Sequence, residues 1–289
     1  MEITEARWHI AGGYGMLAAD MVAALRARGV EPMVTDRDDL DITNPAQVAR
    51  GFADADVVVN CAAYTAVDAA EENEAAAFAV NATGPGVIAR ACAEMGLRMV
   101  HFSTDYVFAG DATTPYPEDA PLDPKGAYGR TKAAGEEQVR AAGADALIVR
   151  TAYLYGRGGP CFPKTIARVG RERGALEVVS DQVGQPTWTR DLADLVVRLV
   201  EAEAPAGTYH GTSSGQTSWF GFAEEIVASA GLGDIVTPTS AADLRRPAPR
   251  PAYSVLGHEA LTRVGVEPIG DWRERWHLAA AEVLADVGG

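Results

Sequence analysis

Hydrophobic and polar positions follow two different patterns along the first half of the chain. Short, uniformly apolar runs predict buried strands, and longer stretches between them repeat apolar residues with the period of a helix. In the first of these stretches, Leu17, Met21 and Leu25 fall on one helical face, and the longest covers residues 74–96. The predicted strands are residues 8–10, 31–35, 55–60, 97–103 and 146–151. Apolar strands separated by helices predict a doubly wound α/β fold, with a parallel sheet covered on both faces.

The pattern becomes mixed after about residue 155. Helices are predicted at residues 161–173, 190–203, 217–230 and 271–286, and a proline-rich loop at 244–254. In the last helix, Trp272 and Trp276 share one face, so we expect both in the core rather than on a surface that stacks on a sugar. We therefore expect a dinucleotide-binding domain over residues 1–155 and a smaller, mainly substrate-binding lobe over 156–289, with segments that cross back to the sheet.

Composition and charge narrow the class of protein. Forty acidic against 25 basic side chains give the 289-residue chain a net charge of −15, which disfavours nucleic acid as a partner. Apolar runs of membrane-spanning length and a signal-peptide pattern are both missing from the sequence, so we expect a cytoplasmic protein with no membrane partner. The three cysteines and five histidines are scattered, so we expect neither a disulfide framework nor a metal site. A homodimer is compatible with the sequence.

A glycine-rich turn follows the first predicted strand. Gly12, Gly15 and Ala18 form a G-x-x-G-x-x-A pattern between that strand and the first helix. The first glycine permits a tight turn, and the second lets backbone N–H groups approach a pyrophosphate at the positive end of the helix. The pattern predicts a dinucleotide site, with an ordinary strand-to-helix turn as the alternative.

The end of the second predicted strand carries an acid followed by a base, Asp36 and Arg37. An acid at this point accepts hydrogen bonds from the adenosine ribose and favours NAD, whereas an arginine neutralises a 2′-phosphate and favours NADP. Because both residues occur, the sequence leaves NADPH and NADH open as cofactors. Either residue could also be a solvated loop charge.

A tyrosine and a lysine stand four residues apart in the stretch AYGRTKAAGE, residues 127–136. If a helix begins there, Tyr128 and Lys132 lie on one face, about 6 Å apart along its axis. A neighbouring ammonium and an oxidised nicotinamide both lower the pKa of a phenol, so we expect Tyr128 to be a useful acid. Ser103 or Thr104, at the end of the fourth strand, could bond a substrate oxygen. The alternative is a packed aromatic residue beside a solvated lysine.

These motifs together resemble those of the extended short-chain dehydrogenase/reductases. Within that superfamily the chain is similar to the dTDP-4-dehydrorhamnose reductase family along nearly its whole length. The similarity is carried by residues 57–85, 101–110, 127–136, 181–194 and 246–256, among them HFSTDYVFAG and DQVGQPTWTRDLAD. Together these stretches are far more specific than any single motif.

The resemblance implies a role for each matching residue. Tyr128 would protonate the C4 carbonyl oxygen of a keto sugar as hydride arrives from NADPH or NADH, Lys132 would hold the ribose, and Thr104 would orient the carbonyl. The implied cofactor-binding residues are Gly12, Gly15, Met16, Leu17, Asp36, Arg37, Asp41, Ile42, Ala62, Ala63, Tyr64, Thr65, Ser103, Tyr128 and Lys132. The implied substrate-binding residues are Thr104, Asp105, Tyr106, Tyr153, Gln182, Arg246 and Arg250. For the small residues at 62, 63 and 65, simple packing is the alternative.

The chain departs from the family pattern at two positions. Tyr153 stands where the family often has a tryptophan against the sugar, which leaves the identity of the sugar open. Arg190 stands where some members carry a metal-binding acid, so we expect no metal there. The basic segment 245–250 suits a diphosphate through its arginine forks, with a solvated loop as the alternative reading.

The implied activity is NAD(P)H-dependent reduction of the C4 keto group of a dTDP-linked 4-keto-6-deoxy sugar. The expected substrate is dTDP-4-dehydro-β-L-rhamnose, giving dTDP-L-rhamnose, and another dTDP-keto-deoxysugar of secondary metabolism is the alternative. A nucleotide-sugar dehydratase or epimerase is the alternative within enzymes. A dehydratase is disfavoured because such relatives place a glutamate after Thr-Asp, where this chain has Tyr106. An epimerase would recycle a tightly held NAD, whereas a reductase must exchange its spent cofactor. A non-catalytic, nucleotide-binding regulatory subunit, like that of methionine adenosyltransferase, is the alternative from another class.

Overall fold

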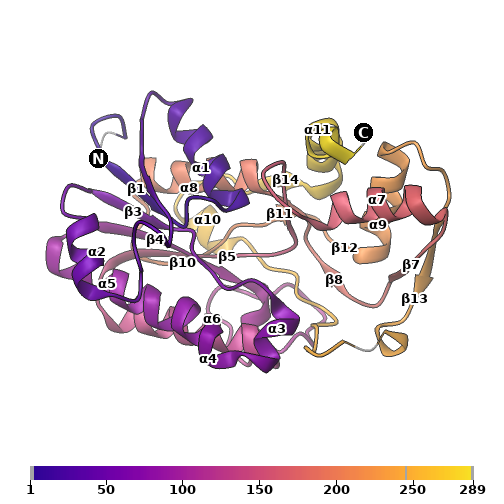
Figure 1. The fold of residues 1–289 in the computed structure, drawn as a ribbon, viewed down its shortest axis with the longest axis horizontal. Coiled ribbons are helices and arrows are strands. Elements are labelled where there is room, and N and C mark those ends of the chain that lie inside the picture. The colour runs from indigo at the N-terminus through magenta and orange to yellow at the C-terminus, as the bar shows by residue number, and fades with distance from the viewer. Residues whose placement is uncertain (1–2, 245, 288–289) are drawn as a thin grey trace.

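A six-stranded parallel sheet forms the centre of the molecule. The computed structural model describes residues 3–244 and 246–287, and Figure 1 shows the sheet between two layers of helices. Its strand order is β10-β5-β4-β3-β1-β2. The strands are β1 (Trp8–Ala11), β2 (Met33–Thr35), β3 (Val57–Asn60), β4 (Arg98–Thr104), β5 (Asp145–Thr151) and β10 (Gly207–His210). The predicted doubly wound α/β fold is confirmed.

The order of the strands reverses beside β1, because β2 pairs with one edge of that strand and β3 with the other. In sheets of this kind, ligands bind outside the carboxyl ends of the strands at the point of reversal. A ligand is therefore expected at the segments that follow β1, β2, β3 and β4.

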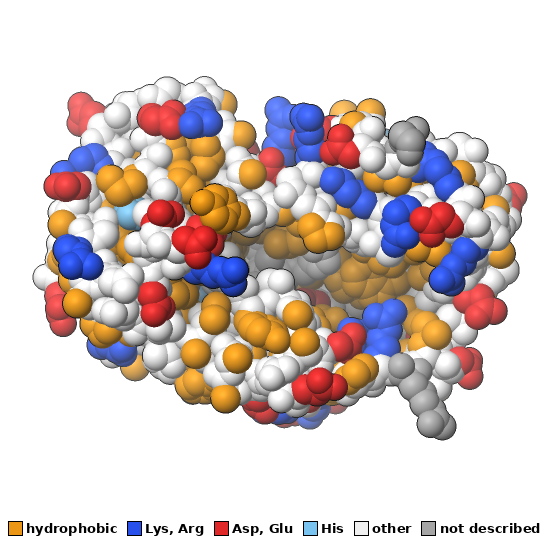
Figure 2. Space-filling view, viewed as in Figure 1, with side chains coloured by type: hydrophobic (Ala, Val, Ile, Leu, Met, Phe, Trp, Pro, Cys, Tyr) orange, Lys and Arg blue, Asp and Glu red, His pale blue; other side chains and the backbone are white. Residues whose placement is uncertain are grey.

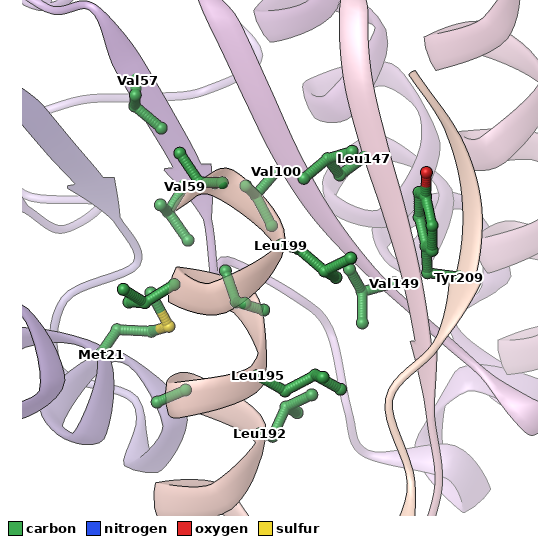
Figure 3. Packing of buried hydrophobic residues seen from close by; sticks show 14 of the residues in the cluster. Met21, Val57, Val59, Val100, Leu147, Val149, Leu192, Leu195, Leu199 and Tyr209 are labelled. Atoms are coloured by element: carbon green, nitrogen blue, oxygen red, sulfur yellow. The ribbon is translucent and has the colours of Figure 1, made fainter. Parts of the chain in front are cut away.

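Helices cover both faces of the sheet. α1 (Met16–Arg26) and α8 (Thr189–Glu201) lie on one face, and α2 (Pro45–Gly51), α5 (Gly84–Met95) and α6 (Ala127–Ala141) lie on the other. Because side chains alternate along a strand, Val57 and Val59 pack under α8 while Val58 packs toward α5. Figure 3 shows Leu195 and Leu199 of α8 against the valines of the sheet.

The sheet differs from the predicted pattern at its edge. The second strand was expected to be buried, but Met33 is 53% and Val34 is 41% exposed. Strand β2 is an edge strand, so its apolar side chains have a neighbouring strand on one side only.

The stretch predicted as one helix over 74–96 contains an irregular turn. It comprises α4 (Glu74–Phe78), a π-helical segment at Ala79–Thr83, and α5. Helix α6 crosses the π segment through Gly135, where a Cβ would lie only 2.1 Å from the backbone oxygen of Asn81. The π segment and α6 thus approach so closely at Gly135 that a side chain there would have no room.

The second half of the chain supplies the smaller part of the molecule, at the right of Figure 1. Its helices are α7 (Phe162–Arg173), α9 (Trp219–Ser229) and α11 (Trp272–Val283), whereas α10 (Glu259–Arg263) packs against β10 in the core of the central sheet. Two-stranded sheets join β6 (Leu154–Tyr155) with β9 (Thr187–Trp188), β7 (Leu176–Val179) with β13 (Val236–Thr239), β8 (Val183–Gly184) with β12 (Thr217–Ser218), and β11 (Ser213–Ser214) with β14 (Ile269–Asp271). Trp272 and Trp276 are buried in the core of this part, as predicted.

Strand β10 and helices α8 and α10 of the second half pack with the central sheet rather than with the smaller part. Strand β10 pairs in parallel with β5, with Tyr209 opposite Val149. Helix α8 packs against α1. Within the described residues, none of the helices has the length and apolar character needed to cross a membrane.

Candidate active site

The turn after β1 has the geometry needed for a close approach to a phosphate. Gly12 has a φ of +83°, and a Cβ at this position would lie 2.5 Å from the backbone nitrogen of Ala62, so a larger residue is excluded. Gly15 precedes α1 and offers no side chain to cap it. The first N–H groups of that helix therefore face the turn without a side-chain partner, which is the arrangement that favours an anion.

Two adjoining cavities follow the carboxyl edge of the sheet. The first has a volume of about 710 Å³, and its lining includes Gly12, Gly15, Asp36, Arg37, Asp41, Ile42, Ala62, Ala63 and Tyr64. The second has a volume of about 480 Å³, and its lining includes Gly15, Met16, Leu17, Ala62, Ala63, Thr65, Ser103, Tyr128 and Lys132. The structure thus brings every residue expected to bind the cofactor to one or both cavities.

The acid and base at the end of β2 are placed differently from each other. The Asp36 carboxylate accepts hydrogen bonds from the backbone N–H of Tyr14 at 2.9 Å and of Arg37 at 2.7 Å, so it ties the glycine turn to β2. The Arg37 side chain is exposed, and its guanidinium lies 3.9 Å from Asp38. The arginine side chain thus projects into solvent, whereas the Asp36 carboxylate is fixed at the wall of the first cavity.

Helix α6 begins with a cap from another helix. Gly126 precedes it without a capping side chain, and the Glu71 carboxylate of α3 (Val67–Glu72) accepts a hydrogen bond from the Ala127 N–H at 2.7 Å. Arg130 pairs with Glu74 through two hydrogen bonds, of 2.9 and 2.7 Å. The first turn of α6, which contains Tyr128, is therefore fixed by two carboxylates, those of Glu71 and Glu74.

Tyr128 projects from this turn into the second cavity. Its ring meets that of Tyr106 edge to face, with the centroids 5.8 Å apart. Burial raises the pKa of Tyr128 to about 12, and a hydrogen bond with Thr104 offsets part of this rise. The direction is opposite to the expected lowering, because burial outweighs every other influence on the phenol in the protein alone.

Lys132 lines the same cavity and is almost completely buried. Its ammonium donates a hydrogen bond to the backbone oxygen of Phe102 at 2.6 Å. Burial lowers the pKa of Lys132 to about 8, and the Glu136 carboxylate opposes this change. The lysine thus shares the cavity with Tyr128 while its ammonium is anchored to β4.

Thr104 ends β4 beside two further residues expected at the substrate. Its hydroxyl donates to Asp105 at 2.9 Å and accepts from the Tyr106 N–H at 3.2 Å. Burial raises the pKa of Asp105 to about 6. On the neighbouring strand, the Thr151 hydroxyl is buried and has no hydrogen-bond partner in the part of the chain that the structure describes, so it suits a bound polar group.

Tyr153 is held in an unusual conformation. Its φ is +47°, a backbone conformation that residues other than glycine rarely adopt. The ring stacks on Trp219 with centroids 3.6 Å apart, and a Cβ at Gly184 would lie 2.6 Å from the phenol carbon. Asp105 and Tyr106 both act on the phenol and help to raise its pKa, which burial raises most. The structure therefore brings Tyr153 to Asp105 and Tyr106.

The other residues expected at the substrate are more dispersed. Gln182 is buried, and its backbone oxygen accepts from the Trp219 N–H. Arg250 forms two hydrogen bonds to Asp68 of α3, of 2.8 and 2.9 Å. Arg246 is exposed, and its charge acts on Asp68 and Tyr106. Arg245, part of the expected basic segment, lies outside the described residues.

The sequence reasoning missed Asn81, in the π segment. Its side chain accepts from the Tyr64 N–H at 2.8 Å and donates to the Tyr64 oxygen at 3.0 Å and to the Thr131 hydroxyl at 3.1 Å. It thus joins the loop after β3 to α6. The signal in the sequence is an asparagine followed closely by glycine and proline inside a helical stretch.

Arg190, the position considered for a metal, forms an ion contact of 3.5 Å with Glu282 and lies over the Trp188 ring. Across the described part of the chain, no three histidine, cysteine, aspartate or glutamate side chains are grouped in a way that could hold a metal ion.

A doubly wound sheet that brings a glycine turn and a Tyr-x-x-x-Lys pair to one edge is the arrangement of the short-chain dehydrogenase/reductases. The family described as RmlD substrate binding domain matches residues 7–285, and the chain belongs to that family.

Relatives of known name are similar over nearly the whole chain. A probable dTDP-4,6-dihydroxy-2-methyloxan-3-one 4-ketoreductase of Streptomyces antibioticus is 45% identical, with 96% of each chain covered. A dTDP-4-dehydrorhamnose reductase of Streptomyces griseus is also 45% identical, with 92% of this chain and 90% of that protein covered. The crystal structure of dTDP-4-dehydrorhamnose reductase from Bacillus anthracis in complex with NADP is 36% identical, with a TM-score of 0.92 over 96% of this chain and 99% of that one.

Proposed function

We propose that this protein reduces the C4 keto group of dTDP-4-dehydro-β-L-rhamnose to give dTDP-L-rhamnose, with NADPH or NADH as cofactor. One observation carries the proposal: the glycine turn, Tyr128 and Lys132 meet along two adjoining cavities at the carboxyl edge of the sheet. The names of the relatives support the reaction, and the NADP complex of the Bacillus anthracis reductase supports the cofactor.

The cavity residues fit a dinucleotide. Gly12 leaves room for a close approach to the turn after β1, and the N–H groups at the start of α1 suit a pyrophosphate. Arg37 is exposed and suits a 2′-phosphate, and Asp36, which accepts one backbone N–H on each oxygen, can still accept from a ribose hydroxyl. When bound, the cofactor supplies the hydride.

Tyr128 would donate its proton to the carbonyl oxygen while Thr104 orients that oxygen. A phenol with a pKa of about 12 stays protonated at neutral pH, and the oxygen of a carbonyl that receives hydride becomes an alkoxide, which is a stronger base than a phenolate. The proton therefore moves toward the product only when reduction occurs. Lys132 would hold the ribose and add positive charge near the phenol.

Arg246 and Arg250 would meet the diphosphate, and Asp105, Tyr106, Tyr153 and Gln182 would surround the sugar. A second candidate substrate is another dTDP-keto-deoxysugar of secondary metabolism. The tyrosine at 153, stacked on Trp219, favours this alternative, as does the similarity to the 4-ketoreductase of Streptomyces antibioticus.

We also propose that the protein acts in the cytoplasm, where nucleotide sugars and reduced nicotinamides are available, as a monomer or a homodimer. The similarity to biosynthetic reductases over nearly their whole length supports the cytoplasmic location. Sedimentation of the purified protein measures whether it is a monomer or a homodimer.

The test of the function is direct. Protein, NADPH or NADH, and a panel of dTDP-4-keto-6-deoxy sugars are mixed, and the absorbance of the reduced nicotinamide is followed. A reductase consumes the nicotinamide in proportion to product, whereas an epimerase or dehydratase regenerates its cofactor and leaves the absorbance constant. Constant absorbance with every sugar would refute the proposal. If the sugars are also recovered unchanged from these mixtures, an epimerase and a dehydratase are excluded as well, and the regulatory-subunit alternative is favoured.

Replacement of Tyr128 tests the mechanism. Tyr128→Phe removes the hydroxyl and keeps the ring that packs against Tyr106, so the fold and the affinity for NADPH should be retained. We expect kcat to fall by about 100-fold or more because the proton donor is lost. An unchanged kcat would exclude Tyr128 as the acid.

A further inference from the structure

A buried carboxylate lies one helical turn behind Lys132. Tyr128, Lys132 and Glu136 are spaced by four residues on α6, so they follow one another along a single face. Glu136 has no exposed surface and Lys132 is only 3% exposed. The two residues are therefore about 6 Å apart in backbone rise along the helix axis, and both side chains are shielded from water.

Glu136 is held by arginines on its other side. Arg150 of β5, which is 1% exposed, donates two hydrogen bonds to its carboxylate, of 2.9 and 2.8 Å. Arg140 donates a third, of 2.6 Å. Burial works against ionisation of Glu136, but these arginines outweigh it and lower the pKa of the carboxyl. Glu136 is therefore a carboxylate at neutral pH.

The Lys132 ammonium, unlike the Glu136 carboxylate, is not hydrogen-bonded to a group of opposite charge among the described residues. Its hydrogen bond goes to a neutral backbone oxygen, and within residues 3–244 and 246–287 no carboxylate contacts the ammonium. We propose that Glu136 is a positioning residue, whose buried charge keeps the Lys132 ammonium protonated and directed at the oxygen of Phe102. Arg150 in turn keeps Glu136 ionised.

The other titratable groups around Lys132 do not supply a negative charge in place of Glu136. On β4, His101 faces the lysine, but burial and the ammonium lower its pKa well below the usual value, so it is neutral. On β5, Arg150 faces Glu136. On α6, Tyr128 is a neutral phenol at pH 7. Glu136 is thus the negative charge that supports the ammonium.

The proposal rests on the proposed function only for its effect on catalysis. Its test therefore measures the pKa of Lys132 directly, without an activity assay. The chain has three lysines, Lys125, Lys132 and Lys164, and Lys132 is the buried one. Protein labelled with 13C at the lysine ε carbons gives three resonances, and the one absent from Lys132→Met is assigned to Lys132. Its chemical shift against pH gives the pKa.

In the unsubstituted protein, Lys132 should titrate near pH 8. Glu136→Gln keeps the shape and removes the charge, so the pKa of Lys132 should fall by about one pH unit or more. Glu136→Asp keeps the charge and changes the shape, so the pKa should stay within a few tenths of a pH unit. A purely structural role predicts no such difference between the two variants, and an unchanged pKa in folded Glu136→Gln would overturn the proposal.

Arg140→Gln is the matched control, because it also removes a contact to Glu136 but leaves the carboxylate in place. Its Lys132 pKa should stay constant or rise slightly. If Glu136→Gln does not fold, the double variant Glu136→Gln/Arg150→Met removes both buried charges, and a smaller fall is expected there. No fall in that variant would also overturn the proposal.

In the reaction, loss of kcat at high pH should move to lower pH together with the Lys132 pKa. If the resonance moves and the kcat profile does not, Glu136 still supports the ammonium, but Lys132 does not have the role given to it in the proposed function. A protein without reductase activity would leave the NMR measurement interpretable.

Discussion

At the scale of single residues, the carboxyl end of β4 brings together two acidic groups whose pKa values are raised by burial. Tyr128 and Asp105 both have raised pKa values, of about 12 and about 6, and Thr104 contacts both. The motif predicted which residues meet here, but it did not predict the direction of the Tyr128 pKa. That direction depends on how much chain covers the phenol, which local spacing does not contain.

Thr104→Val tests the hydroxyl that joins the two groups. Valine has nearly the same shape, so the variant should fold, while the bond to Asp105 at 2.9 Å is lost. If Thr104 orients the substrate carbonyl, as proposed, kcat should fall about 10- to 100-fold, with little change in the KM for NADPH. Steady-state kinetics with each substrate varied separately measures this, and an equal rise in both KM values would contradict it.

Asp105 should also make stability depend on pH. Its pKa rises from 3.8 to about 6 on folding, so the folded state binds more protons than the unfolded state between about pH 4 and pH 6. By linkage, the free energy of unfolding falls as pH rises through this window, by about 3 kcal/mol for this group.

Asp105→Asn removes this dependence and leaves a group of the same shape. The variant should therefore gain stability relative to the unsubstituted protein as pH rises from about 4 to 7. Urea denaturation at several pH values gives the difference, in which the contributions of the other acids cancel. A constant difference across the window would show that Asp105 has an ordinary pKa.

At the scale of elements, helix α6, which carries Tyr128 and Lys132, was predictable from the sequence, but the contacts that support it were not. A helical start at residues 128–132 was a condition of the predicted chemistry, and the structure meets it, because α6 begins at Ala127. Its cap comes from Glu71, which is 56 residues earlier in the chain, and its closest neighbour is the π segment at Asn81. Sequence patterns describe periodicity within an element, whereas these contacts arise only when elements pack.

Glu71→Ala should weaken this support. Loss of the hydrogen bond to the Ala127 N–H should lower the free energy of unfolding by about 1 to 2 kcal/mol and reduce kcat several-fold, because Tyr128 is the next residue. Glu72→Ala is the control, since this neighbouring glutamate is exposed. If both variants lose the same stability by urea denaturation, Glu71 does not cap α6.

At the scale of the whole molecule, the candidate site lies where the two halves of the chain meet. Figure 2 shows the molecule hollowed near its middle, between the sheet and the smaller part. The alternation of strands and helices was enough to predict the doubly wound sheet. The pairing of β10 with β5 and the contact between Asp68 and Arg250, 182 residues apart, required the three-dimensional structure, since neither leaves a local pattern.

The contact between Asp68 and Arg250 raises the question of whether the arginine binds the substrate or only fixes its loop. Both ends of its guanidinium are engaged by Asp68, at 2.8 and 2.9 Å, and the Ala248 N–H also donates to that carboxylate at 3.2 Å. A diphosphate carries more negative charge than a carboxylate and accepts the same fork of hydrogen bonds. The substrate could therefore take the place of Asp68 as the partner.

Two substitutions separate these roles. Arg250→Gln should weaken binding of dTDP about 10-fold or more and leave NADPH binding unchanged. If the arginine meets the diphosphate, Asp68→Asn releases it from a competing charge, so dTDP should bind as tightly as before or more tightly. If the arginine only fixes the loop, both variants lose the same contact and should weaken dTDP binding alike. Isothermal titration calorimetry with dTDP and with NADPH measures all four affinities.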